Sequence, residues 1–231
     1  LTAIQARLTV NGSEINTLNN IHFATLTGGA GDNTLDASEF GELAAATANL
    51  NGMDGDDTLI GGGGLTFTSI MNLSGGTLYT PSIRVADWEQ PNFGLNVWSV
   101  LDGTTIHPTA SSTDFITFYG TWQNIYLGYN SSAASFSTDG FDITVAANLL
   151  ASGTGGLSKQ GAGTLTLSGR NTYSGTTVVQ GGVLALANQA ALGEGPLNLS
   201  SGAKVAMNFT GQSYVTQLTL GGVVQAAGTY G

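Results

Sequence analysis

Two short segments near the N-terminus combine glycine with acidic residues in a pattern that suits calcium binding. They span residues 28–36 and 51–62. Glycine allows the tight turns that bring backbone carbonyls together, and Ca²⁺ takes about six to eight hard oxygen ligands. The candidate ligands are Asp32, Asn33, Asp36, Asp54, Asp56 and Asp57. If the two turns stack, these oxygens lie within a few ångströms of one another, and Ca²⁺ is the expected cofactor.

Both segments resemble the calcium nonapeptide of repeats-in-toxin proteins, Gly-Gly-x-Gly-x-Asp-x-apolar-x. In that family a calcium ion lies between turns of neighbouring coils, so the resemblance implies one ion shared by the two segments. The chain departs from the pattern at Asn33, where the family has its liganding Asp, and at Met53, where the second Gly is expected. The two segments are also not in tandem. The alternative interpretation is a pair of solvated acidic β-turns.

A second stretch with binding chemistry is residues 87–130, which hold all three tryptophans and six of the sixteen Phe and Tyr residues. Trp and Tyr rings pack on the CH faces of sugars while their polar tips stay in water. Carboxylates at Asp87, Glu89, Asp102 and Asp114 accompany them. The candidate sugar-binding residues are Trp88, Trp98, Trp122 and Tyr126. In the alternative interpretation, these rings fill wide coils or cover an edge of the fold.

Few sets of residues in the sequence could act together in catalysis. A β-helical enzyme acting on polysaccharides needs two carboxylates in one groove, or a basic residue beside them. The candidate pairs are Asp87 with Glu89 and Asp139 with Asp142, but acidic turns of this kind arise by chance. The two histidines are too few for a metal site. We therefore expect no enzymatic activity, with a fragment of a β-helical polysaccharide-degrading enzyme as an alternative.

The elements that must position these residues are clearest in residues 155–186. Three short strand candidates, residues 164–167, 176–179 and 182–186, are separated by Gly, Ser and Asn, which form turns. Strands this short and this regularly spaced suit the coils of a parallel β-helix, in which inward Leu and Val residues form ladders.

The same stretch resembles the passenger-associated transport repeat of bacterial autotransporters, also called the autotransporter-associated β-strand repeat. The resemblance runs through residues 156–159, 161–169, 171–175 and 182–186. It implies an extracellular β-helical passenger or surface protein. It implies no particular chemistry, because the repeat marks a scaffold.

Composition narrows the function classes further. Among 231 residues there are 35 Gly but only 4 Pro, and charged residues make up 9 %. The net charge is −10 and the few basic residues are scattered, which argues against nucleic-acid binding. Cys is absent, so thiolate sites and disulfides are excluded. No apolar run approaches the ~20 residues of a membrane span, so we expect no membrane insertion by this segment.

These observations predict an all-β fold, a right-handed parallel β-helix with coils of roughly 20–25 residues. Residues 1–64 form acidic Gly/Asp-rich coils, and residues 65–231 form a transport-repeat type β-helix that includes the aromatic segment. The inward-facing residues are expected to be Leu165, Leu167, Val178, Leu184, Leu186, Leu197, Leu199, Val205, Leu218 and Leu220. Lys159 is expected in a turn, solvated, so that Lys159→Ala would matter far less than Leu167→Asp.

The function predicted from the sequence is a structural or adhesive module of a secreted or cell-surface bacterial protein. The alternative is a carbohydrate-binding module that uses residues 87–130 and binds a surface polysaccharide. The open ends of a solenoid are exposed sheet edges, which favour association. The expected partners are therefore neighbouring coils of a longer parent chain or further copies, in rods or fibres.

Overall fold

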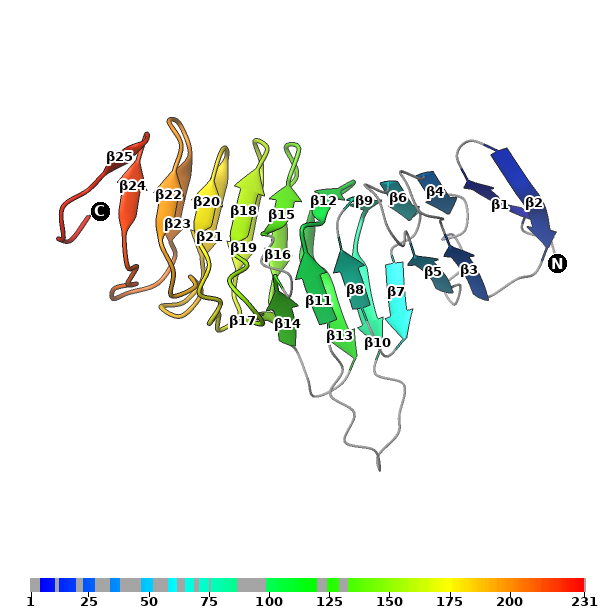
Figure 1. Cartoon of the computed structure of the whole chain (residues 1–231), viewed down its shortest axis with the longest axis horizontal. Helices are drawn as coiled ribbons and strands as arrows, with labels where there is room; N and C mark the ends of the chain where they lie inside the picture. The colour runs from blue at the N-terminus through cyan, green and yellow to red at the C-terminus, as the bar shows by residue number, and fades with distance from the viewer. Residues whose placement is uncertain are drawn as a thin grey trace, which may run out of the picture.

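The chain forms an elongated solenoid of short β-strands, with its N- and C-termini at opposite ends (Figure 1). The computed structural model describes residues 5–10, 13–19, 23–27, 34–37, 47–51, 58–61, 65–68, 71–74, 76–86, 99–119, 124–128 and 133–230. These residues contain no helix, and hence none that would be long and apolar enough to span a membrane. The predicted all-β class is confirmed.

Three sheets form the faces of the solenoid, and a fourth, smaller sheet lies near the N-terminus. The 12-stranded sheet contains, in spatial order, β2 (Ser13–Asn19), β1 (Gln5–Val10), β4 (Thr34–Ala37), β6 (Thr58–Gly61), β9 (Thr77–Thr80), β12 (Thr105–Pro108), β15 (Ala134–Ser137), β18 (Leu157–Gln160), β20 (Thr177–Val179), β22 (Leu197–Leu199), β24 (Leu218–Leu220) and β25 (Val223–Val224). The 7-stranded sheet contains β23 (Lys204–Met207), β21 (Val183–Leu186), β19 (Thr164–Leu167), β16 (Ile143–Val145), β13 (Ser112–Tyr119), β10 (Ile83–Ala86) and β7 (Leu65–Thr68). The 4-stranded sheet contains β17 (Asn148–Ala151), β14 (Asn124–Leu127), β11 (Ser99–Asp102) and β8 (Met71–Ser74), and the 2-stranded sheet pairs β3 (Phe23–Thr27) with β5 (Thr47–Asn51).

Successive coils stack in parallel register. From β9 to β17 the chain visits the 12-stranded, the 7-stranded and the 4-stranded sheet in turn. From β18 to β24 it alternates between the 12-stranded and the 7-stranded sheet. Leu157 pairs with Thr177, and Thr177 pairs with Leu197, so one coil takes 20 residues here. The coils nearer the N-terminus are longer, since Thr77 pairs with Thr105. The parallel β-solenoid predicted from the sequence is confirmed.

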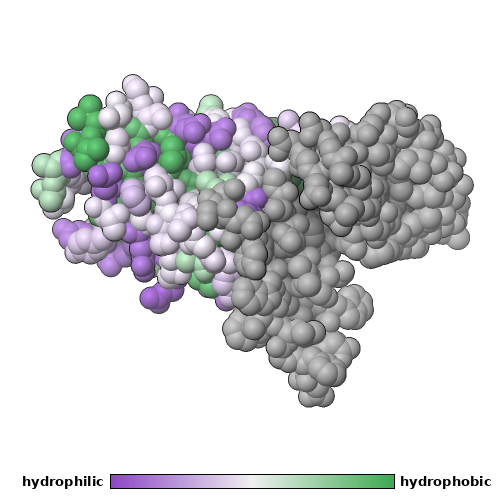
Figure 2. Space-filling view, in the orientation of Figure 1, coloured by the Kyte–Doolittle hydropathy of each residue, from purple (hydrophilic) through white to green (hydrophobic). Residues whose placement is uncertain are grey.

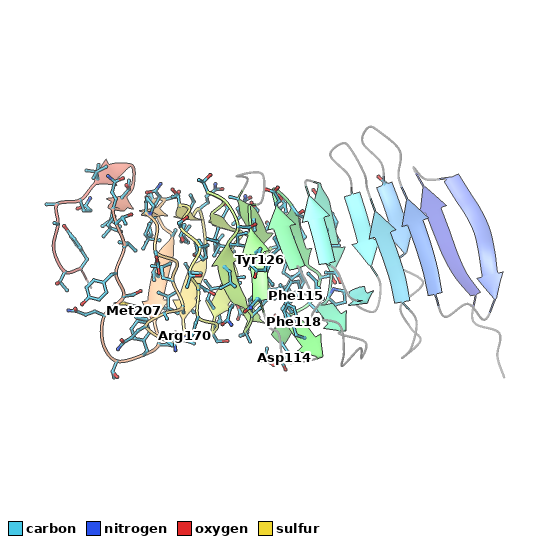
Figure 3. All side chains as sticks on the ribbon, turned by 60° about the horizontal axis from the view of Figure 1, so that its bottom comes forward. Asp114, Phe115, Phe118, Tyr126, Arg170 and Met207 are labelled. Atoms are coloured by element: carbon cyan, nitrogen blue, oxygen red, sulfur yellow. The ribbon has the colours of Figure 1, made fainter. Side chains whose placement is uncertain are left out.

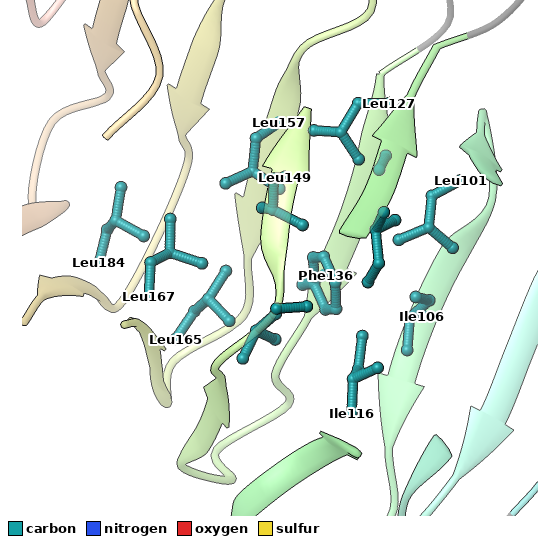
Figure 4. Close-up of a cluster of buried hydrophobic side chains, with 14 of the residues drawn as sticks. Leu101, Ile106, Ile116, Leu127, Phe136, Leu149, Leu157, Leu165, Leu167 and Leu184 are labelled. Atoms are coloured by element: carbon teal, nitrogen blue, oxygen red, sulfur yellow. The ribbon is translucent and has the colours of Figure 1, made fainter. Parts of the chain in front are cut away.

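Apolar ladders fill the interior of the solenoid. Leu165 and Leu167 of β19 are fully buried, and their partners Leu184 and Leu186 of β21 are buried as well. Figure 4 shows Leu165, Leu167 and Leu184 gathered inside the solenoid with Phe136 of β15. Three further residues predicted to face inward, Leu199, Val205 and Leu218, are partly buried and pack against this core. Most of the predicted core is therefore confirmed.

Two of the predicted core positions are wrong. Val178 is only half-buried, because β20 pairs with β18 and β22 in a register that turns Thr177 and Val179 inward. The sequence from 176 to 179 is β-branched throughout, so it offers no alternation that would reveal the inward face. Leu220 is 37 % exposed, because β24 lies near the end of the stack.

The outer face of the 12-stranded sheet is polar and regular. Between β9 and β24 one residue per strand forms an outward row, which we call the hydroxyl row. Its members are Thr77, Thr105, Ser135, Ser158, Val178, Asn198 and Thr219. None of them carries a charge, so this face differs sharply from the acidic character of the chain as a whole.

Antiparallel hairpins stand at both ends of the 12-stranded sheet. β1 and β2 pair antiparallel, with Val10 opposite Ser13. β24 and β25 pair antiparallel, and the two residues between them, Gly221 and Gly222, have positive φ. Positive φ at both central residues gives the turn twist that two-residue hairpins favour. The compositional break predicted near residue 64 lies between β6 and β7, and β6 pairs with β9, so this sheet continues across it.

Two buried threonines on one inward ladder provide a matched test of the packing. Thr104 precedes β12 and is 1 % exposed, and its hydroxyl oxygen has no hydrogen-bond partner in the described part of the chain. Thr177 is 2 % exposed, but its hydroxyl shares a 2.7 Å hydrogen bond with the phenol of Tyr173. An unpaired buried hydroxyl is costly, and so is the loss of a buried partner.

We therefore expect opposite results from the same substitution at the two positions. Thr104→Val should leave the free energy of unfolding unchanged or raise it by up to about 1 kcal/mol, whereas Thr177→Val should lower it by about 1–2 kcal/mol. Urea unfolding of both variants measures the two changes. A loss of stability in Thr104→Val equal to that in Thr177→Val would contradict the assignment of Thr104 as unpartnered.

Candidate functional site

Polar side chains gather where β12, β15 and β18 end. His107 of β12 pairs in register with Tyr79 of β9, and their rings stack with centroids 4.7 Å apart and planes inclined by 28°. Nδ1 of His107 hydrogen-bonds the Asp139 carboxylate, which belongs to the turn after β15. The contact joins one coil to the next, because these two residues are 32 positions apart in the chain.

Asp139 is held from two sides. Its Oδ1 accepts a 2.7 Å hydrogen bond from the hydroxyl of Ser137, while its Oδ2 faces His107. Burial raises the pKa of Asp139, but the hydrogen bonds from Ser137 and His107 and the charges of His107 and Lys159 outweigh it and hold the pKa below its usual value. The backbone of Asp139 has φ +52°, in the left-handed region that Asp tolerates better than most residues. The carboxylate is therefore ionised and fixed in place.

Lys159 occupies the interior of the solenoid, which contradicts the prediction that it is solvated. Its neighbours in the ladder are Phe136 of β15 and Val179 of β20, and all three are fully buried. The ammonium donates to the backbone carbonyls of Gln160, Gly161 and Gly181 at 2.8, 2.9 and 3.1 Å. Gly181 belongs to the next coil, so Lys159 ties two coils together at the corner between the 12-stranded and 7-stranded sheets.

The environment of the ammonium also changes its acidity. Burial lowers the pKa of Lys159 to about 8, although the charges of Asp139 and Asp142 act in the opposite direction. The three carbonyl acceptors match the three N–H donors of a charged ammonium. The alternation of polar and apolar residues gave no sign of this, because Ser158-Lys159-Gln160 contains no apolar residue. Only the register with Phe136 and Val179 reveals that Lys159 faces inward.

Asn171 replaces a strand as the link between coils. Residues 171–175 follow β19 where earlier coils contribute a strand to the 4-stranded sheet. The Asn171 side chain accepts a 2.8 Å hydrogen bond from the backbone N–H of Leu149 in β17 and donates to the carbonyl of Ala191 in the following coil. Because Asn171 is only 4 % exposed, one buried amide connects three successive coils.

Tyr173 fills the interior beside this link. It is fully buried, and burial raises the pKa of its phenol to about 12, although hydrogen bonds with Thr177 and with the backbone of Gly193 oppose the rise. A Cβ on Gly193 would lie 2.5 Å from the Tyr173 ring, so only glycine fits at that position. The residues that give the 157–186 stretch its characteristic sequence are thus largely used to stack one coil on another.

The polar groups of this region are engaged in hydrogen bonds that support the fold. Ser137 donates to the Asp139 carboxylate instead of to His107, whereas an activated serine needs a base as its direct partner. Lys159 is buried with its three donors engaged. The second member of the predicted carboxylate pair, Asp142, accepts a 2.7 Å hydrogen bond from the backbone of Thr164. Each of these groups supports a turn or a coil contact.

The predicted calcium ligands fall largely outside the described residues. Asp32, Asn33, Asp54, Asp56 and Asp57 lie outside them, and Asp36 lies in β4. The strands that follow the two Gly/Asp segments are adjacent, however, since β4 pairs with β6 in parallel with Thr34 opposite Thr58. The two strands are therefore neighbours in the 12-stranded sheet. Within the described ranges, no three metal-ligating side chains come together.

The predicted sugar-binding residues are also mostly outside the described part of the chain. Trp88, Trp98 and Trp122 lie outside it, whereas Tyr126 is half-buried in β14 of the 4-stranded sheet. Figure 3 shows Tyr126 in the same part of the solenoid as Phe115 and Phe118. Phe115 is fully buried and Phe118 packs against the core, as the alternative of rings filling wide coils predicts.

A comparison with protein families identifies the stretch that these stacking residues occupy. The model of the passenger-associated transport repeat matches residues 157–186. Residues 157–186 are a passenger-associated transport repeat. The transport repeat therefore begins at β18, with Lys159 as its third residue, and ends at β21. Its signature residues Lys159, Asn171 and Tyr173 are the buried groups that connect the coils.

One curated protein is similar to this chain well beyond the transport repeat. The chain is 28 % identical over 219 residues to the adhesin BmaC autotransporter of Brucella suis biovar 1 (strain 1330). The alignment covers 91 % of this chain and 6 % of the relative, so the chain spans only a small fraction of that protein's length. No solved structure matches the chain. The chain is thus a β-solenoid that carries an autotransporter passenger repeat and is similar to part of an autotransporter adhesin.

Proposed function

We propose that the chain is a non-catalytic adhesive module of a β-helical protein that bacteria secrete or display on their surface. The observation that supports this most directly is the use of the transport-repeat signature. Lys159, Asn171 and Tyr173 are buried in contacts between coils, so the repeat supplies a rigid rod whose outer faces are free for contact. Similarity to a bacterial adhesin agrees with this role.

Surface display on a non-adherent bacterial strain tests the proposal. The chain is fused to a heterologous outer-membrane anchor, and attachment to epithelial cells and to abiotic surfaces is counted. We expect the native chain to raise attachment several-fold, and a displayed Leu167→Asp chain, in which the core is disrupted, to leave it at background. If a correctly folded native chain adds no attachment on any surface, the adhesive function is wrong.

The C-terminal end supports a second role, end-to-end association. Within the part of the chain that the structure describes, six of the seven exposed large hydrophobic side chains lie in the last coil and its hairpin: Met207, Tyr214, Leu220, Val223, Val224 and Tyr230. Figure 2 shows apolar colour gathered at this end of the molecule. β23 is the outermost strand of its sheet, and an uncovered strand edge beside apolar side chains favours the addition of another β-coil.

In the purified chain, the added coil would belong to another copy. Sedimentation velocity over a range of concentrations should then show association that Val223→Asp with Val224→Asp weakens. Monomeric behaviour of the native chain up to high micromolar concentration would argue against association through this end.

Calcium binding by the Gly/Asp segments remains a prediction, supported by the pairing of β4 with β6. An ion that binds only the folded state stabilises it by about 2.7 kcal/mol at a hundredfold excess over Kd. Millimolar Ca²⁺ should therefore raise the melting temperature, EDTA should reverse the rise, and Asp57→Ala should abolish it. Thermal unfolding that is indifferent to both calcium and chelator would show that these segments are ordinary acidic turns.

A further inference from the structure

The outer face of the 12-stranded sheet carries uncharged residues from β9 to β24, and most of them can hydrogen-bond, although Ser158 is buried and Val178 is apolar. Beside the hydroxyl row runs a second row, in which Tyr79 pairs with His107, and Ser137, itself buried, pairs with Gln160. Neither row contains Asp, Glu, Lys or Arg. Neighbouring strands lie ~4.8 Å apart, so the rungs from β9 to β24 extend over roughly 30 Å. Such a face matches a long, flat partner rather than a small molecule.

A stacked pair of aromatic rings, Tyr79 and His107, lies in the N-terminal part of this face. Tyr79 is 37 % exposed, and it is the one exposed large hydrophobic residue in the described chain that lies away from the C-terminal end. His107 stacks against it, with ring centroids 4.7 Å apart. A Tyr ring offers an apolar body and a hydroxyl tip, a combination that suits the mixed CH and OH surface of a sugar.

Hydrogen-bonding groups adjoin these rings in a fixed arrangement. Because an ionised carboxylate only accepts hydrogen bonds, Nδ1 of His107 is the donor in the hydrogen bond to Asp139. The side chains of His107 and Asp139 are 20 % and 42 % exposed. Asp139 is held ionised by Ser137 and His107. A sugar hydroxyl approaching this corner would meet the Nε2 side of the imidazole, the acceptor oxygens of the carboxylate, and an amide at Gln160.

We propose that this face binds a neutral polysaccharide, anchored at Tyr79, His107 and Asp139 and extended along the hydroxyl row. The net charge of −10 disfavours acidic polymers and anionic membrane surfaces. The uncharged hydroxyl and amide side chains of the two rows can hydrogen-bond the hydroxyl groups of an uncharged polysaccharide. The proposal rests on the adhesive function and names its target class, and it places the contact on the 12-stranded sheet instead of on residues 87–130.

Affinity electrophoresis in gels containing defined polymers tests the proposal with the folded full chain. The neutral probes are galactomannan, hydroxyethyl cellulose, dextran and starch, and the acidic probes are alginate and heparin. We expect retardation by at least one neutral polymer and by neither acidic one. Tyr79→Ala and His107→Ala should each weaken the binding at least tenfold, whereas Thr166→Ala, on the outer face of the 7-stranded sheet, should leave it unchanged.

Three outcomes would overturn the proposal. The first is the absence of retardation by every neutral polymer. The second is binding that Tyr79→Ala and His107→Ala leave intact while Trp88→Ala abolishes it, which would assign the sugar site to residues 87–130. The third is stronger binding to alginate or heparin than to any neutral polymer. If bacteria displaying the chain still attach to cells in any of these cases, the adhesive function stands and only its target class is wrong.

Discussion

Leu167→Asp is expected to unfold the protein. Leu167 is fully buried, and its ladder neighbours are Val145 and Leu186. A carboxylate at this position would have no cationic partner among apolar side chains, and burial of an uncompensated charge costs several kcal/mol. We expect a loss on the order of 5 kcal/mol, which is comparable with the whole stability of a typical domain. Circular dichroism should show a lost or greatly lowered cooperative melting transition.

Thr166→Asp is the matched control for this change. Thr166 precedes Leu167 in β19, is half-buried and alternates to the outer face of the 7-stranded sheet. A new carboxylate there remains in contact with water, so the melting temperature should change by only a few degrees. Similar losses in Leu167→Asp and Thr166→Asp would mean that β19 does not present Leu167 to the core.

Lys159→Ala is the second substitution for which we expect a large loss of stability. It removes a buried side chain from the ladder between Phe136 and Val179 and leaves three backbone carbonyls without their ammonium partner. Removing a buried side chain of similar length costs about 2–5 kcal/mol, so the free energy of unfolding should fall by about 3 kcal/mol. Chemical denaturation, read as the shift in midpoint at constant m-value, measures this loss.

Lys159→Met separates the packing of Lys159 from its charge. The Met side chain fills a similar volume and removes the cost of burying a cation, so this variant should lose less stability than Lys159→Ala. If Lys159→Ala stays within about 0.5 kcal/mol of the native chain, as surface substitutions usually do, then Lys159 is solvated as the sequence predicted.

The sequence revealed the solenoid because its information is local and repeated. Leu165 and Leu167 alternate with threonines, and the glycines around them fix the turns, so strand, face and coil can be read from a few residues. Val178 shows the limit of this reasoning. A run of four β-branched residues has no polar face, and the choice between Val178 and Val179 is made by pairing with β18 and β22.

The buried polar groups were harder to predict because their partners lie one coil away. Lys159 looks like a solvated turn residue until the carbonyl of Gly181, in the next coil, is placed beside it. Asn171 likewise depends on Leu149 and Ala191. Contacts between His107 and Asp139 also span coils. Such contacts cannot be predicted from neighbouring residues in the sequence. They can be predicted once the number of residues per coil is known, because that number says which residues lie side by side.

Whether the signature residues of the transport repeat face inward is tested most directly by titrating Lys159. Its folded-state pKa is lowered, so the unfolded chain binds more protons between pH 8 and the ordinary lysine value of 10.5. Through this group, the free energy of unfolding should therefore rise with pH in that window. The ¹⁵N chemical shift of Nζ in the folded chain, followed from pH 6 to 11, reports the pKa itself. A midpoint near 8 is the result expected for a buried ammonium held by carbonyls, and a midpoint near 10.5 would place Lys159 in water and contradict its role in joining the coils.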